Sequence, residues 1–157
     1  MWYSILKLIH MLSVVIFLGN VITGLFWMHW AVKSGDFKII HHTTRGIIKS
    51  DLYFTIPGAI VITISGLLIA MEANIQVLRI GWMLWAIILF SLSGIIYFLR
   101  VVPLQKKISK LTNDFKGNDN FDWEHFRKIY RAWDGWGIIS VLTPLGAFVL
   151  MLLKVPV

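Results

Sequence analysis

The sequence predicts an all-α fold, a four-helix transmembrane bundle in one domain. Two observations indicate this class. Hydrophobic residues make up 57% of the 157-residue chain, which has a mean hydropathy of +0.74. The apolar residues also gather in four long runs, and about 20 apolar residues in a helix cross the hydrocarbon core of a bilayer. Backbone polar groups in lipid must bond within their own segment, so each run is expected to be helical.

The first run, Trp2–Trp30, is the longest. It is too long for a signal peptide and lacks a basic n-region and a small-residue cleavage site, so we expect it to remain as a membrane helix. The other runs cover about residues 52–71, 80–99 and 132–153. Pro57 and Pro144 lie inside the second and fourth runs, where membrane helices tolerate the kinks that proline produces.

The first and third connections between the runs are rich in Lys and Arg, and the second is not. The first (31–51) and third (100–131) connections hold twelve of the fifteen Lys and Arg residues, and the second (72–79) is a short turn. With four spans, the first and third connections lie on one side. The positive-inside rule puts them in the cytoplasm and both termini outside. In the third connection we expect a turn at 117–120 between helical extensions over 103–115 and 123–131.

The net charge of +7 does not indicate a nucleic-acid partner, because the basic residues lie in these connections and no binding motif accompanies them. We expect the lipid bilayer as partner, with the basic connections on anionic cytoplasmic lipid. The chain has no Cys, which excludes disulfides and thiolate metal sites.

His10 is the main candidate for chemistry, because an ionisable side chain inside a membrane span is costly and commonly functional. It lies about seven residues into the first span, roughly 10 Å below the outer helix end. One interpretation is a ligand to haem iron or a metal ion. The other is a neutral histidine that bonds to a neighbouring helix. The sequence supports the two equally.

Methionines provide a second hypothesis, a copper-handling membrane protein. Met71, Met83 and Met151 approach the same outer end as His10, and thioethers with an imidazole suit Cu(I). For each methionine alone, filling of apolar space is favoured. Spans two to four contain no histidine. An axial haem ligand opposite His10 would therefore be a Met, an open position or a residue of another subunit.

The other histidines are interpreted as solvated, and two aspartates are interpreted as structural. His29, His41, His42 and His125 lie at the cytoplasmic end or in the connections, too far from His10 to share one metal. Asp51 is expected to favour the N-terminus of the second span, and Asp134 is expected to pair with Arg127 or Arg131 at the membrane surface. A cluster of both aspartates with an arginine stays open, as does a functional role for either.

Several short motifs resemble known membrane families. Lys7-Leu-Ile-His10, Phe17-Leu-Gly19 and Gly24-Leu-Phe26 are similar to the opening of the four-helix membrane protoporphyrinogen oxidases of the HemJ type, and Asp51-Leu-Tyr53 through Pro57 is similar to their second helix. In length and layout the chain more closely resembles an uncharacterised bacterial family of four-helix integral membrane proteins. The shared features are Lys7/His10, Asp51/Pro57 and Gly81/Trp82. The copper-resistance D membrane domain is a more distant resemblance.

The resemblance implies a multi-pass protein of the bacterial inner membrane in which His10 ligates haem b. On this hypothesis Lys7 pairs with a haem propionate, and Trp82 and Trp85 wall the pocket. The third span lacks the lysine of the oxidase-type family, so we do not extend the resemblance to protoporphyrinogen oxidation. On the alternative hypothesis of a copper-handling protein, His10 and Met83 would be the copper ligands. A non-catalytic helical subunit of a larger membrane complex, or a homo-oligomer, is the remaining alternative.

Overall fold

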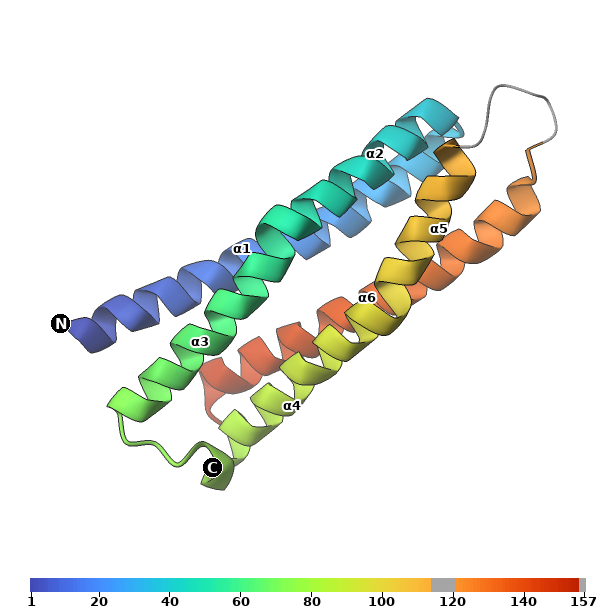
Figure 1. Cartoon of the computed structure of the whole chain (residues 1–157). Coiled ribbons are helices and arrows are strands. Elements are labelled where there is room, and N and C mark those ends of the chain that lie inside the picture. Colours follow the sequence, from blue (N-terminus) through green and yellow to red (C-terminus); the bar gives the residue numbers. More distant parts are fainter. Residues whose placement is uncertain (114–120, 156–157) are drawn as a thin grey trace.

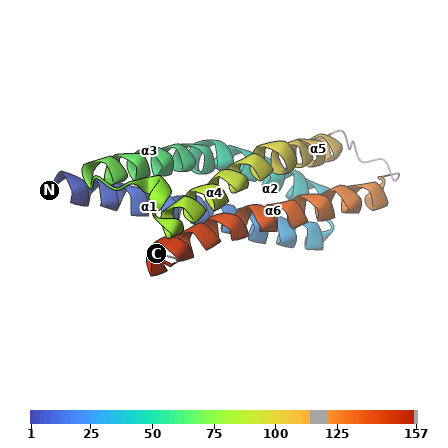
Figure 2. The same cartoon turned by 90° about the horizontal axis from the view of Figure 1, so that it is seen from below.

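The chain forms an up-and-down bundle of four long helical rods, which confirms the predicted all-α fold (Figures 1 and 2). The structure is a computed structural model and describes residues 1–113 and 121–155. The first rod is α1 (Trp2–Ser34). The second joins α2 (Phe37–Ser50), the π-helical turn η1 (Asp51–Thr55) and α3 (Ile56–Glu72). The third joins α4 (Gly81–Ile96), the π-helical turn η3 (Tyr97–Val101) and α5 (Val102–Asn113), and the fourth is α6 (Trp123–Leu153).

The rods are longer than the predicted spans, because helix continues beyond the apolar runs. Most of the predicted first connection is the amphipathic helix α2, and only Gly35 and Asp36 separate it from α1. Gly35 ends α1 with a left-handed φ of 68°, and the Asp36 side chain caps α2 by accepting a hydrogen bond from the Lys38 backbone N–H at 2.7 Å. The expected extensions into the third connection are helical over 103–113 and 123–131. The turn expected at 117–120 lies outside the described residues.

Both termini and the α3–α4 connection lie at one end of the bundle, as Figure 1 shows. The α1–α2 connection, the end of α5 and the start of α6 lie at the other. The 3₁₀ turn η2 (Val77–Arg79) belongs to the short α3–α4 connection. This arrangement confirms that the first and third connections share one end. We call the end with the termini the terminal end, and the opposite end the basic end.

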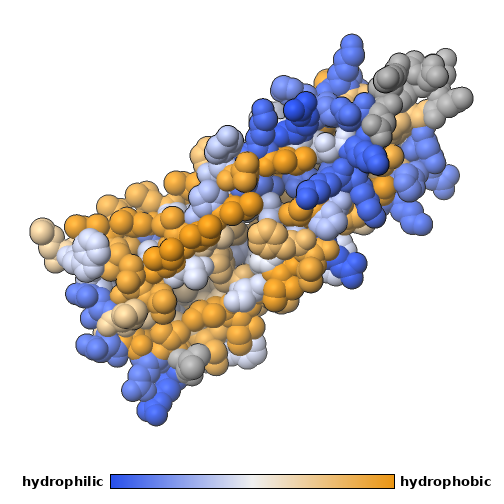
Figure 3. Space-filling view, viewed as in Figure 1, coloured by the Kyte–Doolittle hydropathy of each residue, from blue (hydrophilic) through white to orange (hydrophobic). Residues whose placement is uncertain are grey.

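The surface divides along the bundle axis in the same way. Figure 3 shows an apolar surface over the part toward the termini and a hydrophilic surface over α2, α5 and the start of α6. Large apolar side chains such as Leu67, Leu99 and Leu142 are exposed. A surface of this kind matches lipid rather than water, so the terminal part is the membrane-embedded part.

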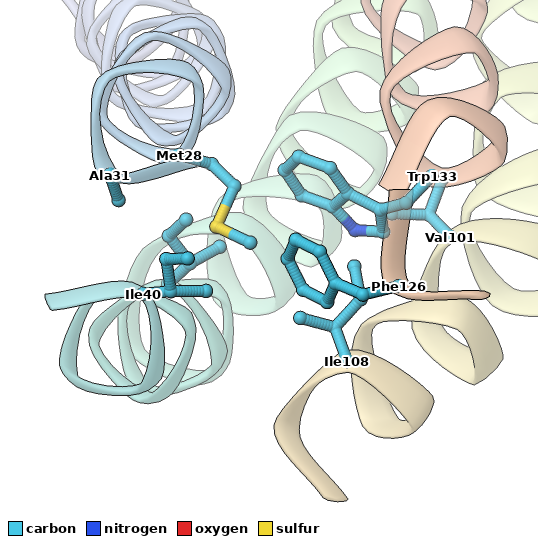
Figure 4. Close-up of a cluster of buried hydrophobic side chains, with 8 residues drawn as sticks. Met28, Ala31, Ile40, Val101, Ile108, Phe126 and Trp133 are labelled. Carbon is cyan, nitrogen blue, oxygen red and sulfur yellow. The ribbon is translucent and has the colours of Figure 1, made fainter. Parts of the chain in front are cut away.

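The hydrophobic core lies toward the basic end. Its fully buried side chains come from α1, α2, α5 and α6 and include Met28, Ile40, Ile108 and Phe126 (Figure 4). The surface of this end is hydrophilic (Figure 3), as expected where water is the solvent, and burial of apolar area from water favours the packing of these side chains. The core holds α2 against α5 and α6.

Small residues line the helix contacts in the embedded part. Gly58 faces Phe17 of α1, and Ala86 and Ala147 are buried where α4 packs on α6. Lipid is as apolar as a leucine side chain, so membrane helices associate through close packing across small residues. The embedded part consists of two tight pairs, α1 with α3 and α4 with α6.

We predict that single cysteines introduced at Lys38 and Lys154 label from opposite sides of the membrane. Both positions are exposed, at the basic and terminal ends, and the natural chain has no Cys to interfere. Because the basic end is expected in the cytoplasm, an impermeant maleimide added to intact cells should label residue 154 only. Labelling of both positions by that reagent would contradict the topology.

Candidate functional site

His10 is held at the contact between α1 and α3. Its Nδ1 lies 3.1 Å from the Ile62 carbonyl oxygen and 3.0 Å from Ser65 Oγ, one turn apart on α3. Gly66 makes room for the ring, because a Cβ atom there would lie 3.2 Å from His10 Cε1. The imidazole is partly buried. Of the two interpretations of His10, the bond to a neighbouring helix is therefore confirmed.

The same geometry is compatible with a ligand role. A carbonyl oxygen accepts only, so the bond to Ile62 requires the proton on Nδ1, which leaves the Nε2 lone pair available. None of the described hydrogen bonds involves Nε2. Metal-ligating histidines characteristically donate their second ring N–H to a carbonyl or carboxylate, which fixes the ring and its tautomer. His10 therefore fits a group that takes one imidazole ligand.

The other predicted site residues share the terminal end with His10. Lys7 is exposed one turn before His10, and Trp82 and Met83 are partly buried at the start of α4. Trp85 is 51% exposed and Met71 is 65% exposed. All belong to the terminal end, as predicted (Figure 1). None of the hydrogen bonds or ring contacts of the described residues joins Trp82, Trp85 or Met83 to His10, so their roles stay predictions.

The remaining histidines are remote from His10. His29, His42 and His125 are exposed, and His41 Nδ1 lies 3.0 Å from Thr112 Oγ1, which ties α2 to α5. Within the described ranges, no three His, Cys, Asp or Glu side chains come together in a way that could hold a metal ion.

Asp51 forms a second polar centre, and its expected role as a helix N-terminal residue is wrong. The helix of the second rod begins at Phe37, in the polar segment α2, and continues through Asp51 into the apolar α3. Asp51 therefore lies inside the helix and not at its N-terminus. Asp51 is only 7% exposed. Its Oδ1 accepts hydrogen bonds from Thr55 Oγ1 at 2.8 Å and from Asn20 Nδ2 at 3.4 Å, and its Oδ2 accepts one from Gln105 Nε2 at 3.2 Å.

Three of the four rods supply these partners. Asn20 comes from α1, Thr55 from η1, and Gln105 from α5, while Tyr97 of η3 lies near enough to interact electrostatically with Asp51. Asp51 and Tyr97 are the first residues of the two π-helical turns, so both turns meet at the carboxylate. π turns insert one extra residue into a helix and recur at functional sites. Sequence reasoning missed this centre, although a polar residue in each of three spans was a usable signal.

Asp134 does not join Asp51, and its expected ion pair with Arg127 or Arg131 is not formed. Within the described part of the chain no salt bridge links these residues. Asp134 is partly buried on α6, one turn after Tyr130, while both arginines are exposed. Arg100, the basic residue nearest Tyr97 in sequence, lies over the Trp136 ring at 5.2 Å. The Asp51 carboxylate is therefore surrounded by neutral donors.

The chain belongs to a family of predicted integral membrane proteins, DUF2269, whose model matches residues 4–155. The match covers all four helical rods, and it confirms the expected membership of an uncharacterised membrane family. No curated protein and no solved structure shows a significant match to the chain.

We predict that Asp51→Leu destabilises the bundle. Thr55 and Gln105 would lose their acceptor, whereas Asn20 still donates to Thr55 Oγ1 at 2.8 Å. Each buried donor without a partner costs about 1–3 kcal/mol. For a chain of this size that loss lowers the midpoint of thermal unfolding by at least about 4 °C, measured in detergent by circular dichroism.

The matched control is Lys49→Leu, which changes an exposed residue one half-turn earlier in the same rod. Surface changes cost at most about 0.5 kcal/mol, so the midpoint should stay within about 2 °C. Equal midpoints for both variants would show that the carboxylate does not hold the rods together.

Proposed function

We propose that this integral membrane protein binds haem b and serves a redox role, with His10 as the axial ligand. The observation that supports the proposal is the bond from His10 Nδ1 to the Ile62 carbonyl, which leaves Nε2 free for iron. A bound haem b would supply one-electron transfer. The resemblance of the first two spans to the HemJ-type family points the same way.

The residues near His10 have separate tasks in this proposal. Ile62 and Ser65 orient the imidazole and fix its tautomer. Lys7 is exposed one turn closer to the membrane surface, where its long side chain can reach a propionate. Trp82 and Trp85 would cover the group from α4. The ligand opposite His10 would be a methionine, an open position or a residue of a second subunit.

The orientation in the membrane is part of the proposal. The surface hollow between α2 and α5 is lined by basic side chains, among them Lys38, Arg45 and Lys49. Anionic lipid on the cytoplasmic face of the bacterial inner membrane attracts such a surface. The basic end therefore faces the cytoplasm, and His10 lies in the outer half of the bundle.

We predict that protein purified after haem-sufficient expression has a Soret band, and that His10→Ala abolishes it. The control is His29→Ala, which removes an exposed histidine from the same helix and should leave the band unchanged. Equal absence of colour in wild type and His10→Ala would overturn the proposal. Copper analysis of the same preparations tests the alternative: stoichiometric copper that is lost in His10→Ala would indicate copper handling that requires His10.

We also predict that Gly66→Ala weakens haem binding by about tenfold. The new Cβ would lie 3.2 Å from His10 Cε1, and the ring cannot shift without stretching its bonds to α3. Gly94→Ala is the matched control, because a Cβ at that position in α4 meets nothing within 4 Å. Haem titration of the apoprotein measures both. Equal affinities would show that the contact with α3 does not position the ligand.

A further inference from the structure

A small cavity adjoins the Asp51 carboxylate in the middle of the bundle. Its volume is about 20 Å³, and it is bordered by residues from all four rods. The polar ones are Asn20, Asp51, Tyr97, Gln105, Trp133 and Ser140. A cavity needs about 10–15 Å³ to hold a water molecule, and a stable buried water needs two to four polar partners. This cavity is large enough for one water, and side chains that carry polar groups border it.

Trp133 supplies an independent sign of an occupant. Its side chain is only 3% exposed and reaches from α6 into the space between the helices (Figure 4). Its Nε1–H is buried, and no described residue accepts a hydrogen bond from it. A buried donor without an acceptor costs about 1–3 kcal/mol. A water in the cavity would accept from Trp133, which a metal cation cannot do.

We propose that Asp51 binds and releases a proton inside the bundle, through a water molecule held in this cavity between its carboxylate and the Trp133 indole N–H. The proposal is independent of haem binding, because it rests on different residues. The ligand is a proton, which a water molecule delivers. The site is the cavity bordered by Asp51 of η1 and Tyr97 of η3.

The surroundings balance the two forms of the carboxylate. Burial in the bundle disfavours the charged form, since a membrane interior solvates charge poorly. The donors Thr55, Asn20 and Gln105 favour it. No cation biases the balance: Arg100 lies over Trp136, Lys49 is exposed, and no described residue forms a salt bridge with Asp51. On α6 the facing groups are Trp133 and Ser140, with Asp134 as the adjacent titratable residue.

The proton is expected at Oδ2. Oδ1 already accepts from both Thr55 and Asn20, whereas Oδ2 accepts only from Gln105. When a hydronium in the cavity transfers its proton, Oδ2 becomes an O–H donor and a neutral water remains. The new O–H donates to that water, while Oδ2 keeps a lone pair that accepts from the Gln105 amide.

Infrared difference spectroscopy of the full chain in lipid vesicles tests the proposal. A carboxylic C=O band that rises as the pH falls, and that shifts in D₂O, should be lost in Asp51→Asn. Asp134→Asn is the control and should keep the band. Asp51→Glu should move the band without abolishing it, which provides a second assay should the asparagine variant fail to fold. No difference between wild type and Asp51→Asn at any pH would overturn the proposal.

The water is tested in the same samples. An internal water O–H band that shifts in H₂¹⁸O should be lost in Trp133→Phe, which removes the N–H and keeps an aromatic ring. Persistence of that band in Trp133→Phe would overturn the proposed water. Loss of the carboxylic band on adding sodium chloride at constant pH would identify a metal cation as the occupant and would likewise overturn the proposal.

Discussion

The buried Asp51 carboxylate is the constraint on which the arrangement of the rods depends. An unpaired charge or an unsatisfied acceptor in the middle of a membrane bundle is costly, so its partners must converge on it. Asn20, Thr55 and Gln105 do so from three rods. A sliding movement of one rod by a single residue would break several of these bonds at once. The polar centre therefore fixes the helix register, which apolar contacts alone specify weakly.

The two halves of the bundle are stabilised by different forces. Toward the basic end, Met28, Ile40, Ile108 and Phe126 form a core that water drives together. In the embedded part the outward-facing side chains meet lipid, and the helices associate through glycine, alanine and serine. Ser93 donates a 2.6 Å hydrogen bond to the Ser140 carbonyl across the α4–α6 contact. Asp51 lies between these two regions, where neither force alone determines the packing.

The sequence predicted the four helices and their alternation, because run length and basic connections depend on the bilayer and not on tertiary contacts. The predicted role of Asp51 was wrong, since interpreting Asp51 as a residue of the helix N-terminus assumed that the helix starts where the apolar run starts. The polar residues of α2 concealed a helix whose apolar side faces the core at Ile40 and Ile47. His10 was found because an ionisable residue in an apolar run is conspicuous. Its partners were not, since one is the backbone carbonyl of Ile62 and the other an ordinary serine.

The contact between α1 and the second rod carries both polar centres. Along it, Asn20 meets Thr55, Phe17 packs on Gly58, and His10 meets Ile62 and Ser65. Ten residues of helix separate His10 from Asn20, about 15 Å. That distance excludes a direct hydrogen bond between the two centres. They nevertheless share one antiparallel contact, and Phe17 packs on Gly58 between them. A shift of α1 along the second rod at Asp51 would therefore also change the contacts of the His10 imidazole with Ile62 and Ser65.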